Sequence, residues 1–307
     1  MLRRPLTTPV AVALTALAAF LWGTSFPVNH VGLFHLDPGT FSFARFAVGA
    51  LSATAVALAL GLYRPRLLLS WEVWLMGLFN SLGFLLQYMA QELTSPAKAA
   101  LLINANAVVV AVLAVLMLRE RLTRPLVAGI VLAVVGVFFL TTEGRIENLR
   151  GGSVLGDALA FLAGATWSVF IILNKRFLHG GHAEQENLMG LAAAVFTATA
   201  VLTFPLGFAM WSDSFLRVPA AGVWPILYAG LLCTTTAYLL WTVALRRLSA
   251  SVSAVVLLLE VPVATVLSVG LGYEALTLAA ALGGLLLFAA IAWVSLYEAR
   301  ASPPAPP

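Results

Sequence analysis

The stretch Ser249–Thr277 constrains this chain most, because it places a carboxylate inside a segment long enough to cross a membrane. About 20 apolar residues span the hydrocarbon core of a bilayer as a helix. Glu260 lies near the middle of the stretch, where a charge costs at least about 2.5–3.5 kcal/mol. We therefore expect Glu260 to face a protein interior or a watery cavity. Pro262 lacks the N–H that would bond the carbonyl of Leu258, so a second polar group is expected beside it.

A matching segment occurs in the first half of the chain. Asn106 precedes Glu120 by fourteen positions, as Glu260 precedes Glu274, and the two segments end in ERLT and EALT. A polar residue therefore lies at the same depth in both segments, which predicts one inner helix used twice.

A second match supports this duplication. Trp22 and Asn29 are seven positions apart, and so are Trp167 and Asn174. Seven residues make nearly two helical turns, so each pair is expected on one face of its helix.

The composition indicates an all-α integral membrane protein with many spans. Hydrophobic residues make up 61% of the chain and charged residues only 10%, whereas soluble domains carry about 25% charged residues. The mean hydropathy is +0.98. The apolar runs predict ten transmembrane helices, at residues 9–30, 39–62, 72–92, 96–118, 125–142, 154–176, 187–210, 223–245, 250–272 and 278–297.

These helices divide into two repeats, with expected boundaries at 1–147 and 148–298, and a proline-rich tail, 299–307, expected to be disordered. Five helices per repeat is an odd number, so the second repeat must enter the membrane upside down relative to the first. Inverted repeats of this kind are typical of secondary transporters, which hold their substrate near the membrane midplane.

The lysine and arginine residues predict the orientation. Of the 17, twelve fall on the side of the N-terminus and four on the opposite side, while Arg45 lies within a span. Both termini are therefore expected in the cytoplasm. Because the basic residues lie at the ends of spans and form no single patch, no nucleic-acid partner is expected.

Aromatic and polar residues inside the spans predict a cavity for a small organic ligand. The predicted cavity residues are Trp22, Gln87, Tyr88, Asn106, Trp167, Tyr238, Trp241 and Glu260. Glu260 could bind a proton or a cation, or be a structural carboxyl, and Asn106 could instead bond a neighbouring helix. The tryptophans close to helix ends are predicted to form an interfacial belt, namely Trp71, Trp74, Trp211, Trp224 and Trp293.

Arg45 lies about 10 Å below the outer end of its predicted helix, at 1.5 Å per residue. It could hold a substrate carboxylate, but snorkelling to the headgroups or tying helix ends together is the favoured interpretation. Glu120 and Glu274 are expected to be structural, with Thr123 and Thr277 as helix N-caps.

Motifs of soluble enzymes are absent from the sequence, including HExxH, GxSxG and glycine-rich phosphate loops. The four histidines divide two and two between opposite sides of the predicted membrane. We expect no metal site, no cofactor and no enzymatic activity. An intramembrane enzyme or a channel-like facilitator remains the alternative to a carrier.

The motifs together resemble the drug/metabolite transporter superfamily, specifically its EamA-type members with two five-helix repeats. The resemblance rests on WGTSF in the first span, on Arg45, on ERLT and EALT, and on the following Gly129 and Gly283. It implies a secondary transporter of the cell (inner) membrane that moves a small metabolite, such as an amino acid, by alternating access, with export the expected direction. It also implies a central cavity lined by the first, third, fourth, sixth, eighth and ninth spans.

Two departures from the family pattern leave the positions of helix breaks open. The family often has Glu-Pro in the ninth span, where this chain reads Glu260-Val261-Pro262, and proline in the fourth, where Ala107 follows Asn106. The expected partners are a small-molecule substrate and the lipid bilayer, with the chain a monomer or a homodimer.

Overall fold

The computed structural model describes residues 6–94, 96–150, 153–179, 187–272 and 275–301, and every regular element in these ranges is helical. In the first half, the α-helices are α1 (Thr8–His35), α2 (Pro38–Ala59), α3 (Trp71–Leu93), α4 (Pro96–Asn104), α5 (Asn106–Leu118) and α6 (Arg124–Thr142). In the second half, they are α7 (Val154–His179), α8 (Leu188–Trp211), α9 (Ala220–Tyr228), α10 (Ala237–Leu245), α11 (Ala250–Leu257), α12 (Glu260–Gly270) and α13 (Leu278–Ala301). Shorter elements are the 3₁₀ helices η1 (Pro65–Leu69) and η2 (Ile146–Leu149) and the π-helix η3 (Ala229–Thr236).

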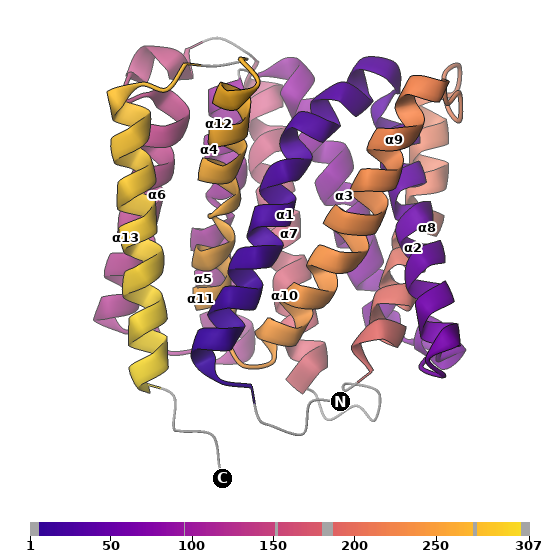
Figure 1. Ribbon diagram of the computed structural model, residues 1–307, viewed down its shortest axis with the longest axis horizontal. Helices are drawn as coiled ribbons and strands as arrows, with labels where there is room; N and C mark the ends of the chain where they lie inside the picture. The colour runs from indigo at the N-terminus through magenta and orange to yellow at the C-terminus, as the bar shows by residue number, and fades with distance from the viewer. Residues whose placement is uncertain (1–5, 95, 151–152, 180–186, 273–274, 302–307) are drawn as a thin grey trace.

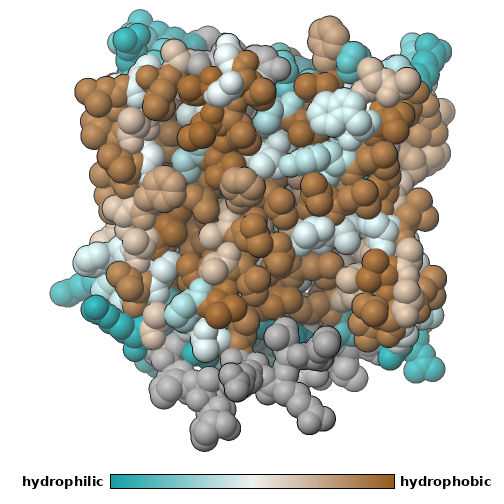
Figure 2. Space-filling model, viewed as in Figure 1, coloured by the Kyte–Doolittle hydropathy of each residue, from teal (hydrophilic) through white to brown (hydrophobic). Residues whose placement is uncertain are grey.

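The described residues contain ten helical segments long and apolar enough to cross a membrane, five on each side of the loop after Thr142. The predicted all-α fold with ten spans is confirmed. The spans pack side by side, and α1 begins at the end of the bundle where α13 finishes (Figure 1). Figure 2 shows hydrophobic side chains over the middle of the visible face and hydrophilic ones gathered towards its two ends.

Two of the spans are interrupted near their middles, at matching positions. The break between α4 and α5 falls at Ala105, and Asn106 begins the second half-helix. The break between α11 and α12 falls at Leu258 and Leu259, and Glu260 begins the second half-helix. The duplicated segments therefore share a backbone interruption as well as a sequence pattern.

Bonds of the 3₁₀ type carry the chain through the second break. The Leu258 N–H donates to the Val255 carbonyl at 3.2 Å, and the Val261 N–H donates to the Leu258 carbonyl at 3.0 Å. The expectation that Pro262 leaves the Leu258 carbonyl without a partner is therefore wrong, because the tighter turn supplies one.

The first helix of each half packs against the broken helix of the other half. Helix α1 contacts α12, and α7 contacts α5 and α4. A Cβ atom on Gly23 would lie 2.8 Å from the Glu260 carbonyl oxygen, which shows how closely α1 approaches that break. At the other break, the Ser168 hydroxyl donates to the Asn106 carbonyl at 3.2 Å. The two halves therefore interlock around both breaks.

Hydrogen bonds also join the end of α5 in the first half to the start of α11 in the second half. Glu120, which follows α5, accepts hydrogen bonds from the Ala250 and Ser251 N–H groups at 2.6 and 3.3 Å, so it caps α11. Thr277 accepts the Ala280 N–H at 3.2 Å, as expected of an N-cap, whereas the Thr123 side chain makes no capping bond to α6.

Two predictions fall wholly or partly outside the described residues. Helix α13 continues to Ala301, so residues 299–301 are helical and not disordered, while residues 302–307 lie beyond the described part of the chain. Glu274 also lies outside the described residues, so its structural role stays a prediction.

Candidate functional site

A cavity of about 120 Å³ lies between the two halves, next to both helix breaks. Its walls come from α1, α2, α3, α4, α5, α7, α8, η3, α10, α11 and α12. The lining residues are Trp22, Ser25, Phe26, Asn29, Arg45, Phe46, Asn80, Phe84, Gln87, Ile103, Asn106, Trp167, Phe170, Ile171, Phe196, Cys233, Thr234, Tyr238, Trp241, Leu257 and Glu260.

Four polar side chains of the wall are available to a ligand or to water. They are those of Asn29, Gln87, Asn106 and Glu260, none of which forms a side-chain hydrogen bond or ion pair with another described residue. Buried polar groups normally find hydrogen-bond partners. Of these groups, Asn29 Oδ1 is fully buried without a partner, and all four side chains line the cavity, so a ligand or water in the cavity can supply their hydrogen-bond partners.

Aromatic rings form the rest of the wall and are held in place by their own contacts. The Trp22 indole N–H donates to the Cys233 carbonyl of η3 at 2.6 Å. The Trp22 and Trp241 ring centroids lie 6.0 Å apart, and those of Trp167 and Phe84 lie 5.2 Å apart. Aromatic walls with a few polar groups are typical of sites for small organic ligands.

The π-helix η3 exposes polar groups in the middle of the eighth span. Its carbonyl at Cys233 and its Thr234 hydroxyl both bond to cavity residues, Trp22 and Arg45. Segments of π-helix inside α-helices are frequent at functional sites, because they displace the regular backbone bonds.

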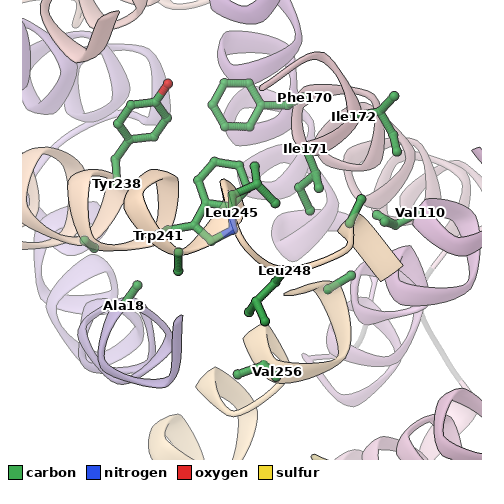
Figure 3. Packing of buried hydrophobic residues seen from close by; sticks show 14 of the residues in the cluster. Ala18, Val110, Phe170, Ile171, Ile172, Tyr238, Trp241, Leu245, Leu248 and Val256 are labelled. Carbon is green, nitrogen blue, oxygen red and sulfur yellow. The ribbon is translucent and has the colours of Figure 1, made fainter. Parts of the chain in front are cut away.

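Two cavity residues of α10, Tyr238 and Trp241, also form buried hydrogen bonds to α7 and α11; we call these bonds and the hydrophobic side chains packed around them the closed layer. The Tyr238 hydroxyl donates to Asn174 Oδ1 at 2.6 Å, and the Trp241 N–H donates to Ser253 Oγ at 3.0 Å. Figure 3 shows the Trp241 ring beside Phe170. In the same view Leu248 lies between Trp241 and the α11 residue Val256. All of these hydrophobic residues belong to one buried cluster.

The structure brings seven of the eight predicted cavity residues around this space: Trp22, Gln87, Asn106, Trp167, Tyr238, Trp241 and Glu260. Tyr88 is the exception. It is buried but does not line the cavity, and it lies behind Arg45, whose Nη1 donates to its hydroxyl at 3.4 Å. Gln87 and Tyr88 are adjacent on α3, so about 100° of helix rotation separates their directions.

The wall also draws on two spans that the family resemblance did not include. Helix α2 contributes Arg45 and Phe46, and α8 contributes Phe196. Among the residues that sequence reasoning missed, Asn29 carried a signal, because its spacing from Trp22 repeats that of Trp167 and Asn174. Those two asparagines differ in role, since Asn29 lines the cavity and Asn174 is bonded within the closed layer.

The cavity contains one acidic and one basic side chain that do not pair with each other. Arg45 and Glu260 both line it, and the structure shows no ion pair between them. No group of three His, Cys, Asp or Glu residues that could hold a metal ion occurs among the described residues. The arrangement is suited to binding a ligand with polar or charged groups at separate points.

Comparison with protein families decides the class of this protein. A model of the EamA-like transporter family matches residues 9–142 and again residues 154–296, so it covers most of the chain. The chain belongs to the EamA-like transporter family. This EamA-like transporter carries one copy of the family's domain in each half, and each copy contains one of the two broken helices.

Similar proteins include two bacterial relatives and a solved structure. The chain is 29% identical over 259 residues to a "Probable terminal-alkyne amino-acid exporter" of Streptantibioticus cattleyicolor, covering 84% of each chain. It is 29% identical over 243 residues to a "Probable amino-acid metabolite efflux pump" of Salmonella typhimurium, covering 76% of this chain and 77% of that one. A crystal structure that is 22% identical matches its fold with a TM-score of 0.77, covering 95% of this chain and 99% of that chain.

Proposed function

We propose that this EamA-like transporter exports a small polar or amphipathic metabolite, such as an amino acid, by alternating access. The observation that carries the proposal is the cavity between the halves, where four polar side chains that bond no other described residue face a space with aromatic walls. The two relatives whose names refer to amino-acid export support this substrate class.

The closed layer supports a carrier mechanism over an open channel. In this proposal the layer blocks one side of the cavity, so a ligand leaves on that side only after contacts such as Tyr238–Asn174 and Trp241–Ser253 separate. Alternating access then consists of breaking this layer while the opposite side of the cavity closes. Flux that saturates with substrate concentration, at rates far below ion conduction, would support the carrier.

Glu260 is the residue that we propose to bind a proton or a positively charged group during the cycle. It is half-buried, lines the cavity and has no partner among the described residues. A carboxylate without a protein partner near the membrane midplane is costly, and residues of this kind mark ion and substrate pathways. Asn106, at the matching break, provides a neutral hydrogen-bonding group on the other side of the site.

We also propose that the protein resides in the cell (inner) membrane with both termini in the cytoplasm, on the basis of its lysine and arginine distribution. The closed layer then faces the cytoplasm. Reporter fusions after Leu67 should read cytoplasmic, and fusions after Arg145 and Ser212 should read external. An external reading at Leu67 together with a cytoplasmic one at Arg145 would reverse the proposed orientation.

Residues of both halves of the chain surround the cavity. We therefore propose that one chain transports on its own, whether it occurs as a monomer or within a homodimer.

The function is tested by comparing metabolites in cells that produce the protein and in cells that carry an empty vector. Mass spectrometry of cells and medium should show a defined set of small metabolites depleted inside and enriched outside when the protein is present. Equal metabolite profiles, with the protein verified in the membrane, would rule out export.

A further inference from the structure

Arg45 is a cavity residue whose charge is not neutralised by any carboxylate in the described part of the chain. It lies on α2, is 1% exposed and lines the cavity, so its side chain does not reach the lipid headgroups. No carboxylate of a described residue lies within ion-pair distance of it. A buried charge without a counter-charge is strongly unfavourable.

Among the described residues, the groups that hold the guanidinium are neutral. Its Nε and Nη2 donate to the Thr234 hydroxyl at 3.3 and 3.2 Å, and its Nη1 donates to the Tyr88 hydroxyl at 3.4 Å. Its Cζ lies 4.4 Å from the centroid of the Phe84 ring and 5.4 Å from that of Phe46. These contacts fix the position of the group, but long bonds to hydroxyls do not offset a full positive charge.

Part of the guanidinium's hydrogen-bonding capacity remains free. An arginine side chain carries five N–H groups, and three of them are used in these bonds. A planar guanidinium with two unused N–H groups at a cavity wall is well suited to a carboxylate, which it can bind with two parallel hydrogen bonds.

We propose that Arg45 is the anion-binding subsite of the cavity and holds the carboxylate of a substrate whose positive group faces Glu260. The substrate class is then a zwitterion of amino-acid type. The inference rests on the proposed export function and deepens it. It assigns the two unpaired charges of the cavity to the two charged ends of one ligand.

The first arm of the test uses the cell's own metabolite pool as the probe. Metabolites that the wild-type protein exports should carry a carboxylate, and Arg45→Gln should lower their export by about tenfold or more. Arg217→Gln is the matched control, because it makes the same substitution at an exposed arginine outside the cavity, so it should stay within about threefold of the wild type. Exported metabolites without an anionic group, or undiminished export by Arg45→Gln, would overturn the proposal.

The second arm separates substrate binding from a structural role of Arg45. Each exported acid is compared in proteoliposomes with its methyl ester, which keeps the shape and removes the negative charge. The wild-type protein should prefer the acid by about tenfold, and Arg45→Gln should lose that preference. A purely structural role would lower transport of acid and ester together and leave their ratio unchanged, which would overturn the proposal.

Two outcomes are kept apart by this design. If the wild-type protein exports nothing, the proposed function fails and the inference fails with it. If it exports acids but Arg45 variants keep the preference for acid over ester, only the inference fails. Where Arg45→Gln does not yield a monodisperse protein, Arg45→Lys decides, because it keeps the charge and loses the planar fork. A wild-type preference for acid over ester in Arg45→Lys would then contradict the proposal.

Discussion

The two helix breaks at the centre of the molecule have the same backbone form and different chemistry. In each, a span is interrupted and a polar residue begins the second half-helix, Asn106 in α5 and Glu260 in α12. Each break packs against the first helix of the opposite half, through Ser168 in one case and Gly23 in the other. Both halves therefore contain the same type of helix interruption, but only the break in the second half carries an ionisable group, Glu260.

Proline is present at only one of the two helix breaks. Pro262 follows Glu260, but the matching position after Asn106 is Val108, and the span is interrupted at both places. Proline is thus not required for this break. Close packing against the opposite half and the short turn bonds are features that both breaks share.

The largest effect is expected for the aromatic wall beside the Asn106 break. Trp167→Ala should reduce transport by about tenfold or more, because it removes a large face of the cavity and its contact with Phe84. Trp293→Ala is the control, since Trp293 is 53% exposed on α13, outside the cavity. Transport in proteoliposomes measures both, and equal losses would show that the cavity wall and the belt are not distinct.

A smaller effect is expected at Asn106 itself. Asn106→Ala should lower transport by about three- to tenfold with little loss of stability, because its side chain bonds no described residue. Asn104→Ala is a matched control two positions away, where the side chain bonds the Ala100 carbonyl outside the cavity. A greater transport loss in Asn104→Ala than in Asn106→Ala would contradict the assignment of Asn106 to the site.

The close approach of α1 to the Glu260 break should show in stability. A methyl group at position 23 would lie 2.6 Å from Val263 Cβ, so Gly23→Ala should destabilise the protein by about 1–3 kcal/mol. Gly284→Ala is the control, because no atom lies within 4 Å of the added group. Unfolding in detergent compares the two variants, and a Gly23→Ala protein as stable as Gly284→Ala would mean that the helices are not closely packed there.

The smallest effect is expected for the proline. Pro262→Val copies the residue at the matching position of the first half. It should lower the free energy of unfolding by less than about 1 kcal/mol, mainly because the unfolded chain gains conformational entropy. The break between α11 and α12 should persist in this variant, because the break between α4 and α5 forms without a proline. A loss of transport as large as that of Trp167→Ala would show that the proline, and not packing, forms the second break.

The sequence predicted the spans and most of the cavity because a bilayer imposes strong constraints. Apolar runs of spanning length are visible directly, and a carboxylate such as Glu260 must avoid lipid. The face that each helix turns towards the cavity was harder to predict. Lipid and protein interior are both apolar, so the apolar pattern along a span does not show which of its faces is buried in protein. Tyr88 was therefore placed on the wall, while Asn29 and the charge of Arg45 were not.

The backbone irregularities were only partly predictable. Pro262 gave a signal for the break beside Glu260, and the repeat placed Asn106 at the same depth. The π-helix Ala229–Thr236 was not predicted. Gly230 and the three threonines that end it are weak helix formers, but this composition does not specify π-type bonding, and the segment also bonds Trp22 and Arg45 of other helices.

The measurement that tests the central claim most directly is the pH dependence of transport by Glu260→Gln. Purified protein in proteoliposomes is assayed for accumulation and for exchange of the metabolite identified by the export comparison, at several pH values. Gln keeps the size and hydrogen bonding of the side chain but cannot change charge. We predict that Glu260→Gln loses the pH dependence or the accumulation of substrate and retains exchange of substrate for substrate. Wild-type accumulation and pH dependence in Glu260→Gln would contradict the claim that the ionisable break distinguishes the two halves in function.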